Sequence, residues 1–261
     1  MNLDNELALA QRLADSAGEI IRRHWKSVSA VENKADASPV TQADREVETA
    51  LRAGIEKAFP AHGIIGEEYG NVRGESPWQW VIDPIDGTRA FIAGQPTFAT
   101  LIALAKDGIP LLGIIDQPIS KERWVGVSGK PTLFHSAKPP VVQPENYRNA
   151  VSHAYISTTS TDYFTPEETA RYEKLRARCA RSQLGGDAYA YGMLANGRLD
   201  IVVDAGMKPY DYCALRPVIE GAEGVITDWQ GKPLTIHSNG SVLAAATEGL
   251  HQQVLALLNN D

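Results

Sequence analysis

The sequence predicts a mixed fold, with an α+β arrangement in its first half and an α/β layer in its second half. Three patterns indicate this: two amphipathic helices at the start, hairpin-spaced strands in the middle, and alternating strands and helices towards the end. The chain has 261 residues, of which 43% are apolar. That is enough for one large core or for two smaller cores packed side by side.

The first helix is predicted from Leu3 to Trp25, because apolar residues recur there at steps of three and four. A second helix is predicted from Thr41 to about Ala58. Pro60 then ends it, since proline disfavours helix in the residue before it. Ile64 and Ile65 begin a short strand. Four further strands are predicted, separated partly by Lys-Asp-Gly and Gln-Pro turns, at 80–82, 98–105, 109–116 and 122–127. The first half therefore places helices against a largely antiparallel sheet.

The segment Lys138 to Glu145 contains three prolines in eight residues and is predicted to connect two units, 1–140 and 141–261. Strands and helices alternate after it. Strands are predicted at 155–157, just before Asp187, and at 200–203, 225–227 and 242–246; helices at 166–179, from Asp187, from Asp211 and at 248–258.

Charge and composition exclude several classes of protein. The formal net charge is −7 without a concentrated basic stripe, which argues against a nucleic-acid partner. Residues 171–181 are basic but are predicted to form an amphipathic helix with a solvated face. Two cysteines are too few for a disulfide framework. Residues 1–21 mix charged with apolar side chains, so they resemble neither a signal peptide nor a membrane span, and we expect a soluble, cytoplasmic protein with no membrane partner.

A pair of aspartates in Trp80-Val-Ile-Asp-Pro-Ile-Asp-Gly-Thr88 is the sharpest chemical feature. An apolar strand ends in Asp83 and Asp86, where buried charge needs a cation or hydrogen-bond donors. Such oxygen ligands suit Mg²⁺. Gly87 and Thr88 open a predicted helix whose free N–H groups favour phosphate. The alternative is that both Asp dipeptides only mark turns.

Two glutamates, Glu67 and Glu68, follow the strand that begins at Ile64. Neighbouring residues on a strand face opposite ways, so at most one of the two is an easy direct ligand. A pair of surface glutamates in a loop is the alternative.

Three more aspartates have both a chemical and a structural interpretation. Asp44 lies three residues after Thr41, as in a capping box, which is compatible with a supporting role near the site. Asp211 follows Lys208-Pro-Tyr, where Asp is a common N-cap. Asp187 follows two glycines, including Gly186, and is open to the same interpretation.

Other catalytic patterns are absent from the sequence. It contains no Gly-x-Ser-x-Gly elbow, no phosphate-binding loop of the Gly-x-x-x-x-Gly-Lys type and no Gly-x-Gly-x-x-Gly. None of the six histidines forms a metal-binding pair. The Asp-x-x-Asp spacing, rather than Asp-x-Asp, disfavours an aspartyl-phosphate mechanism.

Four motifs in order resemble the inositol monophosphatase family across almost the whole chain. They are Lys34-Ala-Asp-Ala-Ser-Pro-Val-Thr41-x-x-Asp44, Gly66-Glu-Glu68, Asp83-Pro-Ile-Asp-Gly-Thr88, and Tyr210-Asp211-x-x-Ala214 with Glu220-Gly-Ala-Glu-Gly224. The resemblance implies alternating helix and sheet layers, with the metals at the junction of two halves. Family members commonly carry Trp-Asp where this chain has Tyr210-Asp211, which alters the pocket wall but not the ligand.

The resemblance also implies roles for particular residues. Metal ligands would be Glu67, Asp83, the Ile85 carbonyl, Asp86 and Asp211. Glu67 and Thr88, with Asp44 behind Thr88, would orient the attacking water. Two or three Mg²⁺ ions, with Mn²⁺ as a possible substitute, would then hydrolyse a small phosphorylated substrate without a covalent enzyme intermediate. A homodimer is expected from the resemblance alone.

The segment Gly185-Gly-Asp-Ala-Tyr-Ala-Tyr-Gly192 resembles the histidinol-phosphate phosphatase branch of the family, as do residues 157–160, 205–211 and 224–231. Histidinol phosphate carries an ammonium group, which Asp187 is suited to pair with. The predicted substrate-binding residues are therefore Asp86, Gly87, Thr88, Gly186, Asp187 and Asp211. Inositol 1-phosphate, another sugar phosphate or a nucleotide phosphate is the alternative substrate. A binding protein without catalysis is the rival of a different class, although every acidic ligand position is kept.

Overall fold

The computed structural model describes residues 2–25, 31–33, 39–136 and 149–259. The predicted connection at 138–145 and residues 34–38 of the first family motif lie outside these ranges. The division into units 1–140 and 141–261 therefore stays a prediction. No helix in the described ranges has both the length and the apolar character needed to cross a membrane.

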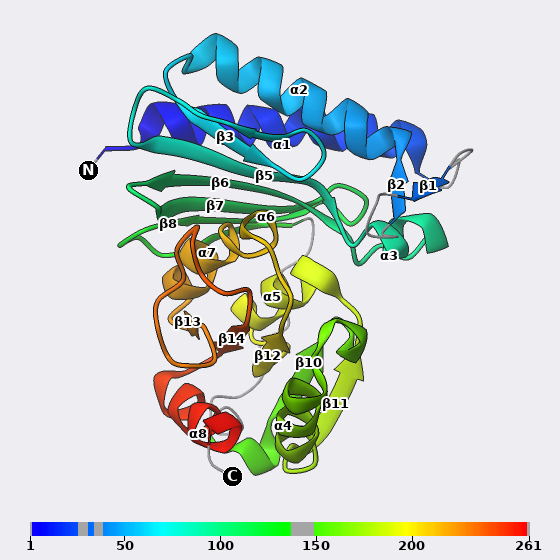
Figure 1. Cartoon of the computed structure of the whole chain (residues 1–261), viewed down its shortest axis with the longest axis vertical. Helices are drawn as coiled ribbons and strands as arrows, with labels where there is room; N and C mark the ends of the chain where they lie inside the picture. The colour runs from blue at the N-terminus through cyan, green and yellow to red at the C-terminus, as the bar shows by residue number, and fades with distance from the viewer. Residues whose placement is uncertain (1, 26–30, 34–38, 137–148, 260–261) are drawn as a thin grey trace.

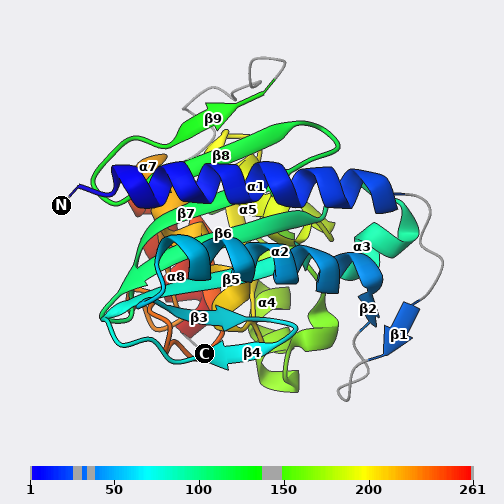
Figure 2. The same ribbon diagram turned by 90° about the horizontal axis from the view of Figure 1, so that it is seen from above.

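Two long helices, α1 (Asp4–His24) and α2 (Gln42–Ala58), lie side by side over one face of a large sheet (Figures 1 and 2). Both agree with their predicted ranges to within a residue. Thr41 and Asp44 form a capping box at the start of α2, in which Asp44 Oδ2 accepts a hydrogen bond from the Thr41 N–H at 2.8 Å. The apolar faces of the two helices, including Leu13, Ile21 and Leu51, are buried against the sheet.

The described residues form a seven-stranded sheet that is antiparallel except where β3 pairs with β5, as predicted for a largely antiparallel sheet. Its order is β4 (Gly70–Val72), β3 (Gly63–Gly66), β5 (Trp78–Asp86), β6 (Ala99–Lys106), β7 (Ile109–Gln117), β8 (Glu122–Val127) and β9 (Leu133–His135). The short strands β4 and β9 were not predicted. The two-stranded pair β1 (Val31–Asn33) and β2 (Pro39–Thr41) was not predicted either. All four strands are too short for an alternation of apolar and polar residues to be recognised in them.

A second helix layer covers the other face of this sheet and contains α5 (Asp187–Ala195), α6 (Pro209–Tyr212) and α7 (Leu215–Gly221). Two paired glycines, Gly113 on β7 and Gly126 on β8, allow the close approach. A Cβ on Gly113 would lie 2.0 Å from the Ala214 carbonyl oxygen, and one on Gly126 would lie 2.3 Å from the Pro217 carbonyl. The backbone of α7 therefore rests directly on the backbone of the sheet.

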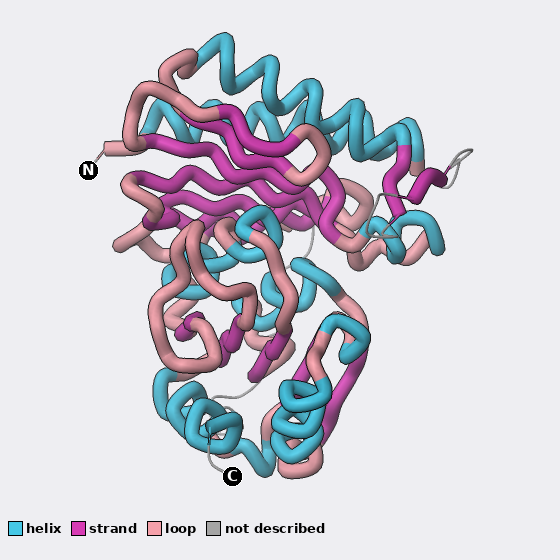
Figure 3. The backbone as a smooth tube through the Cα atoms, in the orientation of Figure 1, coloured by secondary structure: helices cyan, strands magenta, loops and turns pink. Residues whose placement is uncertain are grey.

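A second sheet lies beyond these helices, and Figure 3 shows its strands between two sets of helices. In the described residues its order is β11 (Arg181–Leu184), β10 (Tyr155–Thr158), β12 (Ile201–Asp204), β14 (Val242–Ala245) and β13 (Val225–Thr227). Helices α4 (Pro166–Arg176) and α8 (Glu248–Asn259) cover its outer face. The predicted helix to residue 179 is wrong at its end, because α4 stops at Arg176; residues 177–180 form a turn, and β11 begins at Arg181. The alternation of helix and sheet layers is confirmed.

Candidate active site

The two motif aspartates lie at the end of β5, next to the end of β3. Gly66 is the register partner of Ile82 in the parallel β3–β5 pair, which brings Glu67 beside Asp83. The pairing of β5 with β6 is interrupted between Asp83 and Asp86. Pro84, which has no N–H to donate, lies in this bulge. The strand end is fixed locally, because Asp83 Oδ1 accepts a hydrogen bond from the Ile85 N–H at 3.0 Å.

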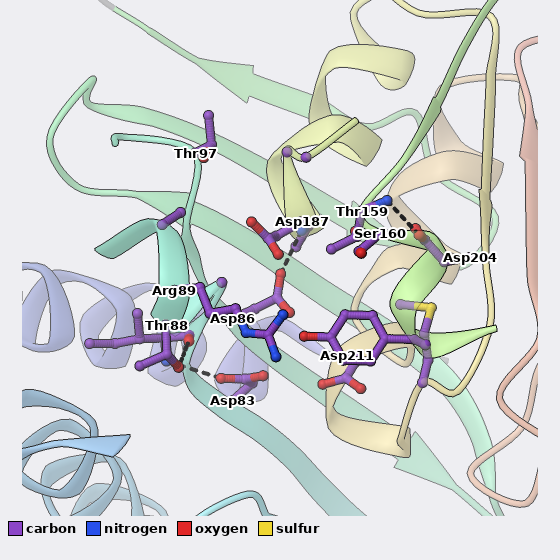
Figure 4. A pocket seen from close by; sticks show the side chains of 18 of the residues that line it. Asp83, Asp86, Thr88, Arg89, Thr97, Thr159, Ser160, Asp187, Asp204 and Asp211 are labelled. Atoms are coloured by element: carbon purple, nitrogen blue, oxygen red, sulfur yellow. Dashed lines mark hydrogen bonds between the residues drawn. The ribbon is translucent and has the colours of Figure 1, made fainter. Parts of the chain in front are cut away.

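Asp211 completes an acidic cluster from the other side. One carboxylate oxygen from each of Asp83, Asp86 and Asp211 lies within 4.8 Å of the others. Figure 4 shows these three side chains gathered in one part of a cavity. Asp211 is not the N-cap of its helix, so the structural alternative given for it is wrong: α6 begins at Pro209, two residues before the predicted start, and Asp211 Oδ2 accepts a hydrogen bond from the N–H of the cap residue Lys208 at 2.6 Å. This bond to the backbone fixes the orientation of the Asp211 carboxylate.

Burial and mutual repulsion raise the pKa values of the clustered acids. Burial is the largest cause of the raised pKa of Asp83, followed by the charges of Glu67, Asp86 and Asp211. Burial also raises the pKa of Asp86, with Asp187 the next cause. The pKa of Asp211 rises to about 7, mainly through burial. Carboxylates held so close are stabilised by a cation, and oxygen donors of this kind fit Mg²⁺ or a similar hard ion.

Glu67 lines the same cavity, in the turn that joins β3 to β4. It interacts with Asp83, since a side-chain hydrogen bond between the two contributes to the raised pKa of Asp83. Glu67 therefore lies at the acidic cluster and is not a surface glutamate in a loop.

The predicted phosphate turn also borders the cavity. Gly87 has a φ of 86°, a left-handed conformation that favours glycine, and it precedes the short helix α3 (Thr88–Ala93). Thr88 Oγ1 lies 3.1 Å from the Ile85 carbonyl oxygen and 3.4 Å from Asp44 Oδ1. Asp44 thus caps α2 and also faces Thr88, so its two interpretations from sequence are compatible.

Asp187 approaches the same turn from α5. A Cβ on Gly87 would lie 2.8 Å from the Asp187 carboxylate, so the absence of a side chain at residue 87 makes room for Asp187. Gly186, with a φ of 114°, is the N-cap residue of α5. Burial raises the pKa of Asp187 to about 6, and the charge of Asp204 acts in the same direction while that of Arg89 opposes it.

All predicted site residues except Asp44 line one cavity of about 580 Å³ between the two sheets. Sequence reasoning missed several other lining residues, among them Arg89, Tyr163 and Asp204. The Arg89 guanidinium lies 5.4 Å from the Tyr163 ring centroid. Asp204 could have been found, because it ends a buried apolar strand just as Asp83 does. Arg89 and Tyr163 lie in irregular or short segments and carry no such signal.

Asp204 is held by a buried hydrogen-bond network. Its Oδ1 accepts from the Thr159 N–H at 2.7 Å and from the Thr158 hydroxyl at 3.0 Å, and its Oδ2 accepts from the Tyr191 hydroxyl at 2.8 Å. Figure 4 shows the bond between Thr159 and Asp204 on the side of the cavity that faces the second sheet. The cavity therefore holds two more acids, Asp187 and Asp204, beside the acidic cluster, and Asp187 lies near enough for its charge to raise the pKa of Asp86.

Comparisons with known proteins agree with this geometry. A model of the inositol monophosphatase family matches residues 2–261. The chain is 43% identical to the bifunctional phosphatase IMPL2, chloroplastic, of Arabidopsis thaliana, over 98% of this chain and 75% of that one. It is 32% identical to a histidinol-phosphatase of Mycobacterium tuberculosis, over 98% of each chain. A solved inositol monophosphatase from Zymomonas mobilis is 45% identical, with a TM-score of 0.87 and 99% of both chains covered.

The fold, the acidic cluster and these likenesses together define a metal-dependent phosphatase. The chain belongs to the inositol monophosphatase family.

Proposed function

We propose that this protein hydrolyses L-histidinol phosphate to L-histidinol and phosphate, a step of histidine biosynthesis, in a Mg²⁺-dependent reaction. The observation that carries the proposal is the second acidic pair, Asp187 and Asp204, in the same cavity as the metal-type cluster. Histidinol phosphate carries a phosphate at one end and cationic groups at the other. Two acids beside the metal-type cluster suit such a substrate, because they keep their negative charge available for a cationic group once metal ions neutralise the cluster. The names of relatives at about 32% identity, the histidinol-phosphatases, support the choice.

The residues that would hold Mg²⁺ are Glu67, Asp83, the Ile85 carbonyl, Asp86 and Asp211. They offer only oxygen donors, and the raised pKa values of Asp83, Asp86 and Asp211 show that these sites favour neutralisation of their charge. When bound, the ions make water a better nucleophile and offset negative charge on the phosphoryl group. Mn²⁺ suits the same donors, and two or three ions are proposed.

The remaining chemistry falls to side chains and backbone groups near the cluster. Thr88 orients the attacking water with its hydroxyl, and Asp44 holds that hydroxyl in place from behind. Glu67 acts on the same water. The N–H groups at Gly87 and Thr88 bind the phosphate, beside Asp86 and Asp211. Water attacks phosphorus directly, so the P–O bond to histidinol breaks as the new P–O bond forms.

Asp187 and Gly186 are proposed to bind the other end of the substrate. The Asp187 carboxylate is partly buried and lies against Gly87, in the phosphate turn. An ammonium group placed there gains a charged hydrogen bond in a site of low polarity. A neutral polyol gains less from the same carboxylate.

Inositol 1-phosphate is the second candidate, because the Zymomonas mobilis protein at 45% identity is named an inositol monophosphatase. Other sugar and nucleotide phosphates are further alternatives on the same scaffold. The two proposals differ only in the group that binds beside Asp187, since the metal cluster serves either substrate.

A substrate panel tests the proposal directly. Phosphate release with Mg²⁺ is measured on histidinol phosphate, inositol 1-phosphate, fructose 1,6-bisphosphate and adenosine 3′,5′-bisphosphate. We expect the highest kcat/KM for histidinol phosphate. A higher value for any of the other three would reject the substrate assignment while leaving the metal-dependent chemistry in place.

The role of Asp187 is tested with Asp187→Asn, which keeps the shape and removes the charge. We expect kcat/KM for histidinol phosphate to fall about 10-fold or more relative to the change for inositol 1-phosphate. Asp162→Asn is the matched control. Asp162 is an exposed acid that precedes the cavity residue Tyr163 but does not itself line the cavity. Equal losses on both substrates would show that Asp187 does not recognise the ammonium group.

A further inference from the structure

A buried ion pair in α2 lies directly behind the turn that contains Glu67. Glu48 is 0% exposed and Arg52 is 9% exposed. The two are one helical turn apart, and Arg52 donates two hydrogen bonds to Glu48 Oε1, at 2.8 Å from Nε and 2.7 Å from a terminal nitrogen. This pair was not among the residues that sequence reasoning selected.

Both members of the pair bind the backbone of the β3–β4 turn. Glu48 Oε2 accepts a hydrogen bond from the Glu68 N–H at 2.7 Å, and Glu48 Oε1 lies 3.1 Å from the Tyr69 nitrogen, which donates to it. Arg52 donates to the Gly70 carbonyl oxygen at 2.5 Å. Three consecutive backbone units after Glu67 are therefore attached to one buried side-chain pair.

The residue before Glu67 is fixed by the same pair. A Cβ on Gly66 would lie 2.3 Å from Glu48 Oε1 and 2.4 Å from an Arg52 terminal nitrogen. The ion pair thus packs against the backbone on the N-terminal side of Glu67 and hydrogen-bonds to it on the C-terminal side. From this fixed stretch of backbone the Glu67 side chain lines the cavity.

Stability alone does not explain such a pair. Replacement of a buried ion pair by well-packed apolar residues is often neutral or stabilising, because burial of charge opposes the attraction between the partners. The pair also has no net charge, so it adds little to the repulsion among the acids of the cluster. A lone carboxylate in the position of Glu48 would bind the same N–H groups but would add to that repulsion.

We infer that Glu48 and Arg52 are positioning residues for Glu67: they set the direction of its carboxylate towards the metal cluster and so determine how tightly Mg²⁺ binds. They do not contact the reacting atoms themselves. The inference rests on the proposed role of Glu67 as a metal ligand and is independent of the choice of substrate. Partners of this indirect kind typically change metal affinity by about 10- to 100-fold when they are replaced.

The test is Mg²⁺ titration of the substrate-free protein by calorimetry, with Glu48→Gln as the first variant. Its side-chain amide cannot accept both backbone N–H bonds and also satisfy Arg52, so we expect Mg²⁺ to bind about 10-fold more weakly. The saturating-Mg²⁺ kcat should fall as well, while KM changes little. Glu46→Gln is the control on the same helix, since Glu46 pairs with Arg23 and His24 on the surface, and it should bind Mg²⁺ as the unaltered protein does.

Arg52→Lys provides a second variant if Glu48→Gln fails to fold. Lysine keeps the charge but cannot reproduce the paired bonds to Glu48 together with the bond to Gly70, so it too should weaken Mg²⁺ binding. Unaltered Mg²⁺ affinity in a folded variant would overturn the inference, whatever its melting temperature. Glu67→Gln separates this failure from failure of the proposed function. If Glu67→Gln binds Mg²⁺ normally, Glu67 is not a ligand; if it binds weakly while the folded α2 variants bind normally, only the positioning role is wrong.

Discussion

The Asp86 carboxylate accepts a hydrogen bond of 2.5 Å from the backbone N–H of Ala188, which lies 102 residues further along the chain in the first turn of α5. Asp86 therefore belongs to the acidic cluster and also accepts a hydrogen bond from the N-terminus of α5, which lies on the opposite side of the cavity. The positive end of the α5 dipole stabilises the charge of Asp86, which partly offsets its repulsion by Asp187, Asp211 and Glu67.

Asp86→Asn separates the two roles of this residue. The asparagine oxygen can still accept from Ala188, so the free energy of unfolding in a chelator should change by about 1 kcal/mol or less. Turnover with Mg²⁺ should fall by roughly two orders of magnitude, because a charged ligand is lost. Asp86→Ala should lose turnover equally and also lose stability. Urea unfolding and phosphate release measure the two effects, and normal turnover in Asp86→Asn would remove Asp86 from the ligand set.

Asp83→Asn tests the most buried acid of the cluster in the same way. Asp83 is only 1% exposed, and its hydrogen bond from the Ile85 N–H survives the substitution. We expect metal-dependent turnover to be lost while circular dichroism and the unfolding transition show a folded protein. Activity close to that of the unaltered protein would contradict a ligand role for Asp83.

Thr88→Val removes a hydroxyl with little change in volume. If this hydroxyl orients the attacking water, kcat should fall by about 100-fold or more while KM and Mg²⁺ affinity stay close to their original values. Thr88→Ser keeps the hydroxyl and should retain most of the activity. Steady-state kinetics on both variants decides the matter, and similar kcat values for valine and serine would show that the hydroxyl takes no part.

The acidic motif at residues 83–86 was predictable because an apolar strand is followed directly by two aspartates, a pattern that indicates both a strand end and a metal site. The helix pattern of α2 was equally clear, yet Glu48 and Arg52 were overlooked because charged residues on an amphipathic helix are ordinarily assigned to solvent. Their position one residue after Val47 and Leu51, on the buried face, was a usable signal.

Asp211 shows what sequence could not determine. Its place in the cluster was expected only from a family resemblance, and its position in α6 was predicted wrongly. The helix starts at Pro209, a favoured first residue, rather than at the aspartate. The proximity of Asp211 to Asp83 depends on how α6 and α7 pack on the large sheet, which is a tertiary property that no local pattern encodes.

Gly113→Ala should disrupt that packing. The added Cβ would meet the Ala214 backbone at 2.0 Å, and backbone cannot move aside as a side chain can. We expect the free energy of unfolding to fall by about 3 kcal/mol or more. Gly249→Ala, in α8 with open space around it, is the control and should be neutral or slightly stabilising. Equal stabilities of the two variants in urea would show that the sheet and α7 can separate without loss.

His251 should make stability depend on pH. Its Nε2 lies 2.8 Å from Thr227 Oγ1, whose own hydrogen is donated to the Asp228 carbonyl, so Nε2 carries the hydrogen of a neutral ring. Burial lowers the pKa of His251 below its usual 6.5. Protonation therefore favours the unfolded chain, and stability present above pH 6.5 is lost as the pH falls through the lowered pKa.

Melting temperatures of the unaltered protein and of His251→Gln, measured from pH 8 to pH 5, test this expectation. Glutamine can donate the same hydrogen bond but cannot gain a proton. The advantage of histidine over glutamine should shrink as the solution becomes more acidic. Two curves that stay parallel would mean that His251 does not contribute to the acid sensitivity of the fold.

The acidic cluster joins side chains from well-separated parts of the chain, and this bears on biogenesis. Glu67, Asp83 and Asp86 emerge from the ribosome well before Asp211, which contributes one side of the cluster. A nascent chain that has exposed only the large sheet thus has an incomplete set of acids and no α5 to cap Asp86. A metal ion that needs the whole cluster would therefore bind only after Asp211 has been synthesised and α6 has packed, and it would stabilise the folded chain in preference to fragments.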